Sequence, residues 1–196
     1  MKLLTATNNK HKIKEFSEIF ENTGIELVSP SSLGLHVEVV EDGDTFAENA
    51  LKKAQGFRDA SGMASVADDS GLVVYELGGA PGVYSARYGG EGLDDKGRTA
   101  LLLENMKEIN DRRAAFVCSI ALVTTDGRVI TAEGRCEGKI CYSPSGENGF
   151  GYDPVFVPDG FDRTFAELSA DEKNLISHRG RALAELQKKL IEEEIK

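Results

Sequence analysis

The chain has 196 residues, enough for one domain with a substantial core. Its formal net charge of −10 argues against the basic face with which proteins coat nucleic-acid polymers. No apolar run approaches the roughly 20 residues of a membrane helix, and the N-terminal stretch lacks the apolar core of a signal peptide. The three cysteines lack metal-site spacing, which favours reduced thiols in the cytoplasm. We therefore expect neither a nucleic-acid polymer nor a membrane as partner.

A polar turn joins the first two predicted elements, a strand over residues 2–6 and a helix over Lys10–Phe20. Unpaired N–H groups and the positive end of the helix dipole meet at this turn, which favours an anion site. Lys12, one turn into the helix, would add a charge. Alternatively, Asn8 or Asn9 merely caps the helix, and the two roles are compatible.

A second strand is predicted over residues 25–29, and a capping box at Thr45 and Glu48 predicts a helix that extends to about Ala60. Its apolar stripe consists of Phe46, Ala50, Leu51, Ala54 and Phe57. The preceding loop is acidic and includes Glu41, which the helix dipole alone would stabilise. Lys53 is expected on or near the solvated face of the helix.

An apolar strand runs directly into Asp68 and Asp69, followed by Ser70 and a glycine. Neighbouring carboxylates repel each other and are partly desolvated at a strand end, and a cation relieves both costs. Hard oxygen ligands of this kind suit Mg²⁺. The alternative is an ordinary polar turn, because Asp, Ser and Gly are common turn residues.

The second half of the chain alternates between predicted elements and glycine-rich loops. We expect a strand over residues 72–77, a loop over residues 78–90 that shapes a cleft or subunit contact, and a helix over residues 94–109. Two apolar runs, 114–125 and 129–138, flank Asp126 and Gly127 and predict a long hairpin. Residues 155–157 form a short strand, and Ser177 precedes a final helix with an apolar side of Leu183, Leu186, Leu190 and Ile191.

Aromatic residues lie between glycines in the loop before that short strand. The ring of Phe150 is suited to stacking on a nucleobase, and Asp153 to accepting a hydrogen bond from a ribose or base. His178 and Arg179 add donors. Together with the anion-binding turn and the acids, this loop is typical of a protein that binds a nucleoside triphosphate.

Six motifs spaced along the chain resemble those of the inosine triphosphate pyrophosphatases. Their segments are Thr7–Lys12, Thr45–Ala50, Ala67–Leu72, Gly79–Arg87, Gly149–Pro154 and Ser177–Gly180. The resemblance spans nearly the whole chain in register, and Asn8 is the one local departure, where glycine is frequent.

The resemblance implies an α/β fold in which a long, curved mixed sheet with flanking helices forms two lobes around a central cleft. Residues 1–196 would be a single domain of this kind, in a homodimer. The implied reaction is the Mg²⁺-dependent hydrolysis of deaminated purine nucleotides, ITP, dITP and XTP, to the monophosphate and pyrophosphate.

The resemblance also implies roles for individual residues. Asp69 would accept the proton of the attacking water, and the metal ligands would be Glu41, Asp68 and Asp69. The substrate-binding residues would be Thr7, Asn8, Asn9, Lys10, His11, Lys12, Lys53, Ser70, Phe150, Gly151, Tyr152, Asp153, Lys173, His178 and Arg179. Two alternatives remain, namely a metal-dependent phosphatase that releases orthophosphate and a nucleotide-binding module without turnover.

Overall fold

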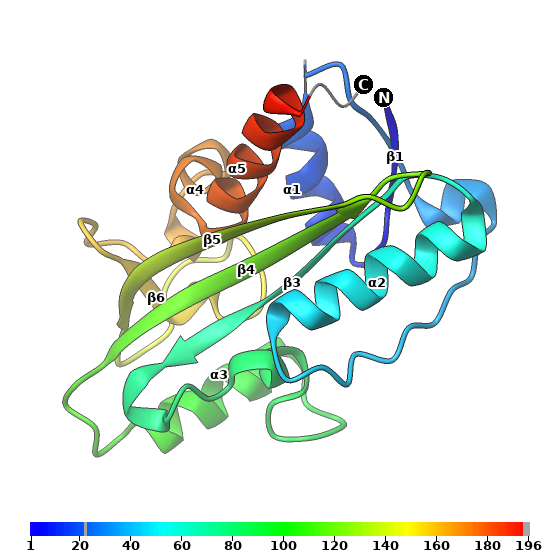
Figure 1. The fold of residues 1–196 in the computed structure, drawn as a ribbon. Coiled ribbons are helices and arrows are strands. Elements are labelled where there is room, and N and C mark those ends of the chain that lie inside the picture. Colours follow the sequence, from blue (N-terminus) through cyan, green and yellow to red (C-terminus); the bar gives the residue numbers. More distant parts are fainter. Residues whose placement is uncertain (22, 194–196) are drawn as a thin grey trace. The chain divides into compact units, whose positions relative to one another are not determined.

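A computed structural model of the chain describes residues 1–21 and 23–193 (Figure 1). It contains a six-stranded sheet in the order β2-β1-β3-β4-β5-β6. β1 pairs in parallel with β2 and β3, whereas β5 and β6 are antiparallel. The sheet is therefore mixed and flanked by helices, which confirms the predicted fold class.

The strands and helices have the following bounds. The strands are β1 (Lys2–Thr5), β2 (Glu26–Val28), β3 (Ser65–Val74), β4 (Arg113–Val123), β5 (Val129–Ile140) and β6 (Phe156–Pro158). The α-helices are α1 (Lys10–Phe20), α2 (Phe46–Ser61), α3 (Asp95–Asn105), α4 (Ala170–Ile176) and α5 (His178–Glu192).

The chain divides into two compact units. Unit 1 comprises Met1–Asp69, Cys118–Gly134 and Arg179–Lys196, and unit 2 comprises Ser70–Val117 and Arg135–His178. The division falls within β3, β4 and β5, so each of these strands contributes residues to both units.

Unit 1 buries apolar side chains on both faces of its strands. Successive residues of a strand point to opposite faces, so Leu3 joins one core cluster and Leu4 the other. The first cluster includes Phe16 of α1 and Leu183 of α5, and the second includes Ala54 of α2. Within this unit, α1 and α5 therefore cover one face and α2 covers the other (Figure 1).

Unit 2 has its own core, which is rich in aromatic rings. Phe116 of β4 lies edge-on to Phe156 of β6, with ring centroids 4.8 Å apart, and is stacked on Phe165 at 5.7 Å. Leu102 of α3 belongs to the same cluster and is fully buried. This core supports the glycine-rich loop that precedes β6.

Most predicted elements are present, and most differences lie at their ends. Asp68 and Asp69, predicted at a strand end or in a polar turn, instead lie within β3, which continues unbroken from Ser65 to Val74. α1 and α2 begin at the predicted caps, and the hairpin of β4 and β5 is present. β3 ends at Val74, where a 3₁₀ turn replaces the predicted strand end, and α3 ends at Asn105 rather than at residue 109. The short helix α4 was not predicted, although Ser169 and Glu172 form a capping box that marks its start.

Two side-chain predictions on the helices are wrong. Ile191, expected on the apolar side of α5, is 78% exposed, whereas Ala182, not predicted on that side, is fully buried in the core cluster. Lys53, expected on the solvated face of α2, is buried, because it pairs with two acids, Glu41 and Asp69.

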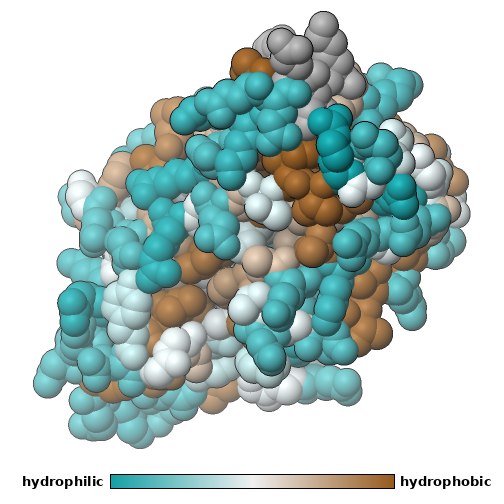
Figure 2. Space-filling view, viewed as in Figure 1, coloured by the Kyte–Doolittle hydropathy of each residue, from teal (hydrophilic) through white to brown (hydrophobic). Residues whose placement is uncertain are grey.

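Hydrophilic residues cover much of the face visible in Figure 2. None of the helices in the described residues is both long and apolar enough to cross a membrane.

Candidate active site

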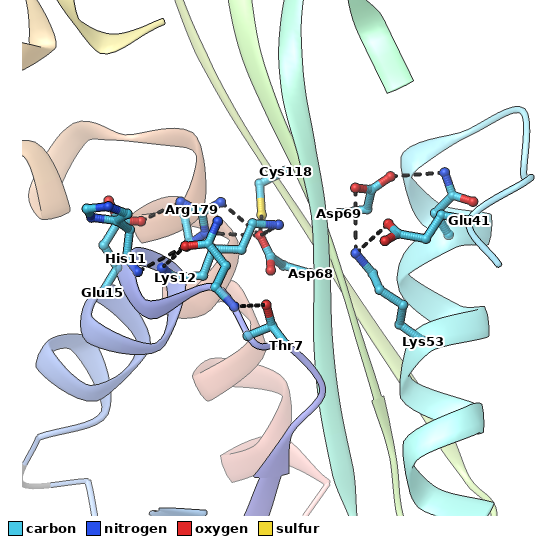
Figure 3. A network of polar contacts seen from close by, with 12 residues as sticks. Thr7, His11, Lys12, Glu15, Glu41, Lys53, Asp68, Asp69, Cys118 and Arg179 are labelled. Carbon is cyan, nitrogen blue, oxygen red and sulfur yellow. Dashed lines mark hydrogen bonds and ion pairs between the residues drawn. The ribbon is translucent and has the colours of Figure 1, made fainter. Parts of the chain in front are cut away.

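The strand geometry of β3 separates the two neighbouring aspartates. Val66 belongs to the core cluster under α1 and α5, and Ala67 to the cluster under α2. Because side chains alternate along a strand, Asp68 lies on the same face of β3 as Val66, and Asp69 lies on the same face as Ala67. Figure 3 shows the two carboxylates on opposite sides of β3, each among different partners.

Asp68 lies among cations on the side of α1 and α5. Its Oδ2 atom accepts hydrogen bonds from Nε and Nη2 of Arg179, at 3.0 and 2.8 Å, and lies 3.1 Å from Nζ of Lys12. Nη1 of Arg179 pairs with Glu15 of α1. The thiol of Cys118 on β4 also contacts Oδ2, at 4.0 Å.

The ionisation of Asp68 is fixed by this surrounding charge. Burial raises its pKa, because desolvation penalises the charged form, but Lys12, Arg179 and Lys53 outweigh burial and hold the pKa far below its usual range. For Arg179, burial lowers the pKa because desolvation penalises the charged guanidinium, but Asp68 and Glu15 outweigh burial and raise the pKa above its ordinary value. Asp68 is therefore a permanently charged counter-ion and a poor proton acceptor.

Asp69 lies on the side of α2, in a less cationic environment. Its Oδ2 atom accepts a hydrogen bond from Nδ2 of Asn49 at 3.1 Å, and its Oδ1 atom is 3.7 Å from Nζ of Lys53. The same Nζ atom lies 2.7 Å from Oε2 of Glu41. Lys53 therefore joins the two carboxylates, which explains why this lysine is buried rather than solvated.

The pKa of Asp69 moves in the opposite direction to that of Asp68. Burial raises it, and the opposing effects of Lys53, Lys12 and the Asn49 hydrogen bond do not cancel the rise. For Lys53, burial lowers the pKa, but Asp68, Asp69 and Glu41 outweigh it and keep the ammonium charged. Two adjacent carboxyl groups with divergent pKa values are typical of a site that divides its acid–base duties.

The predicted three-acid metal site is not what the geometry shows. Within residues 1–21 and 23–193, no group of three or more His, Cys, Asp or Glu side chains is arranged to hold a metal ion. Asp68 is directed to the other face of β3, so it does not join Glu41 and Asp69. Mg²⁺ in nucleotide enzymes is commonly held by one or two carboxylates together with substrate phosphates and water. The pair of hard oxygen donors gathered by Lys53 fits that requirement.

The turn between β1 and α1 confirms the capping interpretation. Asn9 is the N-cap of α1, and its Oδ1 atom accepts hydrogen bonds from the backbone N–H groups of His11 and Lys12. The N–H of Asn9 donates to Oγ1 of Thr7 at 3.1 Å. Asn8, Lys10 and His11 are exposed. Anion binding at this turn stays a prediction.

In unit 2, Asp153 organises the glycine-rich loop. Its Oδ2 atom accepts hydrogen bonds from the backbone N–H of Phe150 at 2.9 Å and from Nζ of Lys173 at 2.7 Å. A Cβ atom on Gly149, which has φ of 73°, would lie 2.0 Å from that oxygen, so only glycine fits there. Nζ of Lys173 lies 5.1 Å from the centroid of the Phe150 ring.

The remaining predicted residues of unit 2 occupy varied positions. His178 is stacked on Phe116, with ring centroids 4.6 Å apart. Tyr152 is buried and its hydroxyl donates to the carbonyl of Ser85 at 2.9 Å, which indicates a structural role. Gly151 and Ser70 are half-buried, the latter directly after Asp69 on β3.

Three residues of the site were not predicted from the sequence, namely Glu15, Asn49 and Cys118. Helical spacing carried a signal for two of them. Asn49 lies four residues before Lys53 on α2, and Glu15 lies three residues after Lys12 on α1, so each shares a helix face with a predicted residue. Cys118 had no such signal.

Comparisons with known proteins found similar sequences and structures. The model of the Ham1 family matches residues 3–189. A dITP/XTP pyrophosphatase of Desulfotalea psychrophila is 50% identical over 184 residues, which cover 94% of this chain and 82% of that protein. Another, of Desulforamulus reducens, is 50% identical and covers 93% and 92%. The structure of the Staphylococcus aureus Ham1 protein superposes on this chain with a TM-score of 0.88 at 40% sequence identity. The superposition covers 98% of this chain and 100% of that protein.

Proposed function

The chain belongs to the Ham1 family, and on this premise we propose that it hydrolyses deaminated purine nucleoside triphosphates such as dITP, ITP and XTP. The products would be the nucleoside monophosphate and pyrophosphate. The observation that supports this most is the pair of adjacent aspartates with opposite pKa shifts, one of which shares a cation with Glu41.

Asp69 is the proposed general base. Cleavage between the α- and β-phosphates requires a water molecule in line with the leaving pyrophosphate, and a carboxylate that takes its proton as the new P–O bond forms. The raised pKa of Asp69 makes it the better proton acceptor of the two aspartates. The hydrogen bond from Asn49 would hold its carboxylate in one orientation.

Glu41 and Asp69 would hold a divalent cation, and Mg²⁺ is the proposed ion. Such an ion supplies charge neutralisation on the phosphates and lowers the pKa of a bound water. Lys53, which lies between the two carboxylates, would then be displaced towards the phosphates, where its charge serves the same end.

The phosphates would bind at the start of α1. Lys12 would supply the charge, and the turn from Thr7 to His11 would supply polar groups at the positive end of the helix dipole. Ser70 is a further proposed contact. The dense negative charge of the chain makes a cation and placed lysines necessary for binding a triphosphate.

The base and sugar would be bound by Phe150, Gly151, Asp153, Lys173 and His178, whereas the predicted contact of Arg179 is not retained, because its buried guanidinium already binds Asp68 and Glu15. Hypoxanthine and xanthine present a 6-oxo acceptor, whereas adenine presents a 6-amino donor, so buried donors directed at that position would be left unpaired against adenine. Each unpaired donor costs roughly 1–3 kcal/mol, which gives useful discrimination. We do not retain a base contact for Tyr152, because its hydroxyl already pairs with Ser85.

Three further proposals concern the whole chain. It would act as a single domain and as a homodimer, as the resemblance implies, and in the cytoplasm. The three free cysteines support a reducing compartment.

A substrate panel tests the proposal. ITP, XTP, GTP and ATP would each be incubated with the protein and Mg²⁺, and both pyrophosphate and orthophosphate would be measured. We expect pyrophosphate from ITP and XTP at rates well above those from ATP and GTP. Orthophosphate without pyrophosphate would instead identify a phosphatase. ITP binding without either product would identify a binding module.

A further inference from the structure

Glu15 is a largely buried acid on α1 for which the proposed reaction has no role. Its side chain is 13% exposed, and it forms an ion pair with Nη1 of Arg179. An acid in such a place is costly unless a partner compensates for its desolvation. The i,i+3 spacing places Glu15 and Lys12 on the same face of α1 (Figure 3).

Carboxylates bind the guanidinium of Arg179 on two edges. Nε and Nη2 donate to Asp68, and Nη1 pairs with Glu15. The Arg179 side chain is 2% exposed. Because a guanidinium is planar and its donors are fixed in a fork, two carboxylates on different edges determine its orientation.

Lys12 shares the same oxygen of Asp68 but is more accessible. Its Nζ lies 3.1 Å from Oδ2, and its side chain is 15% exposed, against 2% for Arg179. Of these two cations, Lys12 is therefore the one that can turn towards an anion from solvent. If Lys12 leaves Asp68, Arg179 still donates to the buried carboxylate as long as it stays in place.

We propose that Glu15 is a positioning residue that keeps Arg179 on Asp68, so that Lys12 is released to bind the substrate phosphate. The inference rests on the proposed function for the role of Lys12. Without the charge of Glu15, the group of Lys12, Glu15, Asp68 and Arg179 changes from neutral to net positive. The triphosphate is then attracted at least as strongly, but Arg179 competes with Lys12 for it and the phosphates are held out of line.

The Glu15→Gln variant tests the positioning role, because such a role should change kcat but not raise KM. We expect kcat for ITP to fall about tenfold while KM stays within about twofold of the parent or decreases, as for an interaction that acts on alignment rather than on ground-state binding. Glu18→Gln is the matched control, because Glu18 lies on the same helix and pairs with Lys14 near the surface. An unchanged kcat, or a KM increase that accounts for the loss of kcat/KM, would overturn the proposal.

A double-mutant cycle with Arg179→Gln tests whether Glu15 acts through Arg179, and its comparison within the Arg179→Gln background still serves if Glu15→Gln alone folds poorly. In the Arg179→Gln background, Glu15→Gln should change kcat by less than about twofold and should raise the melting temperature, because it removes a buried acid that has lost its partner. Independent effects of the two substitutions on kcat would overturn the proposal.

Binding of inorganic tripolyphosphate, measured by calorimetry, separates this inference from the proposed reaction. Lys12→Met should weaken binding at least about tenfold, whereas Glu15→Gln should bind as tightly as the parent or tighter. Equal weakening in both variants would contradict a positioning role. If the parent protein releases no pyrophosphate from ITP, the proposed function fails, and the binding comparison still decides the role of Glu15.

Discussion

The two faces of β3 place Asp68 and Asp69, which have identical side chains, in different electrostatic environments. On the face of α1 and α5, two cations contact one carboxylate oxygen, and a second acid balances the charge. On the face of α2, a single lysine is divided between two carboxylates. Burial raises the pKa on both faces, but only on the first do the cations reverse it.

This difference shows how Asp68 and Asp69, two adjacent identical residues, acquire different roles. Strand alternation sends them to opposite faces, and the helices that cover those faces supply different partners. Asp68 becomes a fixed counter-ion that holds cations, whereas Asp69 becomes a proton acceptor. Four substitutions test this division, beginning with the largest expected effect.

Asp69→Asn should lower kcat for ITP by about 10²–10⁴, as for a lost general base. At saturating Mg²⁺, nucleotide affinity should be largely retained, because the amide keeps the shape of the side chain. Steady-state rates of pyrophosphate release together with calorimetric titration of the nucleotide would measure both. A kcat close to that of the parent would remove Asp69 from the chemistry.

Asp68→Asn should mainly reduce stability. It leaves Arg179 and Lys12 beside a neutral amide, and removal of one partner from a buried ion pair typically costs about 3–5 kcal/mol. Urea denaturation would measure the free energy of unfolding, with Asp69→Asn as the matched control. The control should be less destabilised, because burial already favours the neutral form of Asp69. The division would fail if the control were the less stable protein.

Glu41→Gln should raise the Mg²⁺ concentration required for half-maximal activity at least about tenfold, because it removes one of two donors to the ion. A titration of activity against Mg²⁺ measures this. Glu38→Gln is the control, since Glu38 is an exposed acid three residues earlier in the same loop. Superimposable titrations of the Glu41 variant and the parent would exclude Glu41 from the metal site.

Asn49→Ala should produce the smallest effect, a shift in the acid limb of the kcat profile. The hydrogen bond from Asn49 favours the charged form of Asp69 and lowers its pKa, so its loss raises that pKa further. Activity that needs ionised Asp69 is lost as pH falls through this pKa, so the acid limb should move to higher pH. One hydrogen bond predicts a shift of less than about one pH unit. A movement to lower pH would contradict the assignment.

Local patterns accounted for most of the fold. The capping box at Thr45, the cap at Asn9 and the turn at Gly127 each depend on residues a few positions apart, so the sequence was sufficient to predict them. The end of β3 could not be predicted, because Val74 is followed by Tyr75, Glu76 and Leu77, whose alternation of apolar and polar side chains fits a strand equally well.

The sequence indicated individual residues of the candidate site but not which of them lie together. Side chains alternate along a strand, so Asp68 and Asp69 lie on opposite faces of β3, and Asp68 does not lie with Glu41 and Asp69. Partners from distant segments were beyond local reasoning. Arg179 reaches Asp68 across 111 residues and Glu15 across 164 residues, and no local pattern indicates such pairs.

A carboxyl titration of the metal-free protein by ¹³C NMR tests the division of duties most directly. The Asp68→Asn and Asp69→Asn variants would assign the two resonances. The account predicts that Asp69 takes up its proton above the ordinary value for aspartate, about 3.9, while Asp68 stays ionised well below it. The reverse order, or two carboxyl groups that titrate together at the ordinary value, would contradict it.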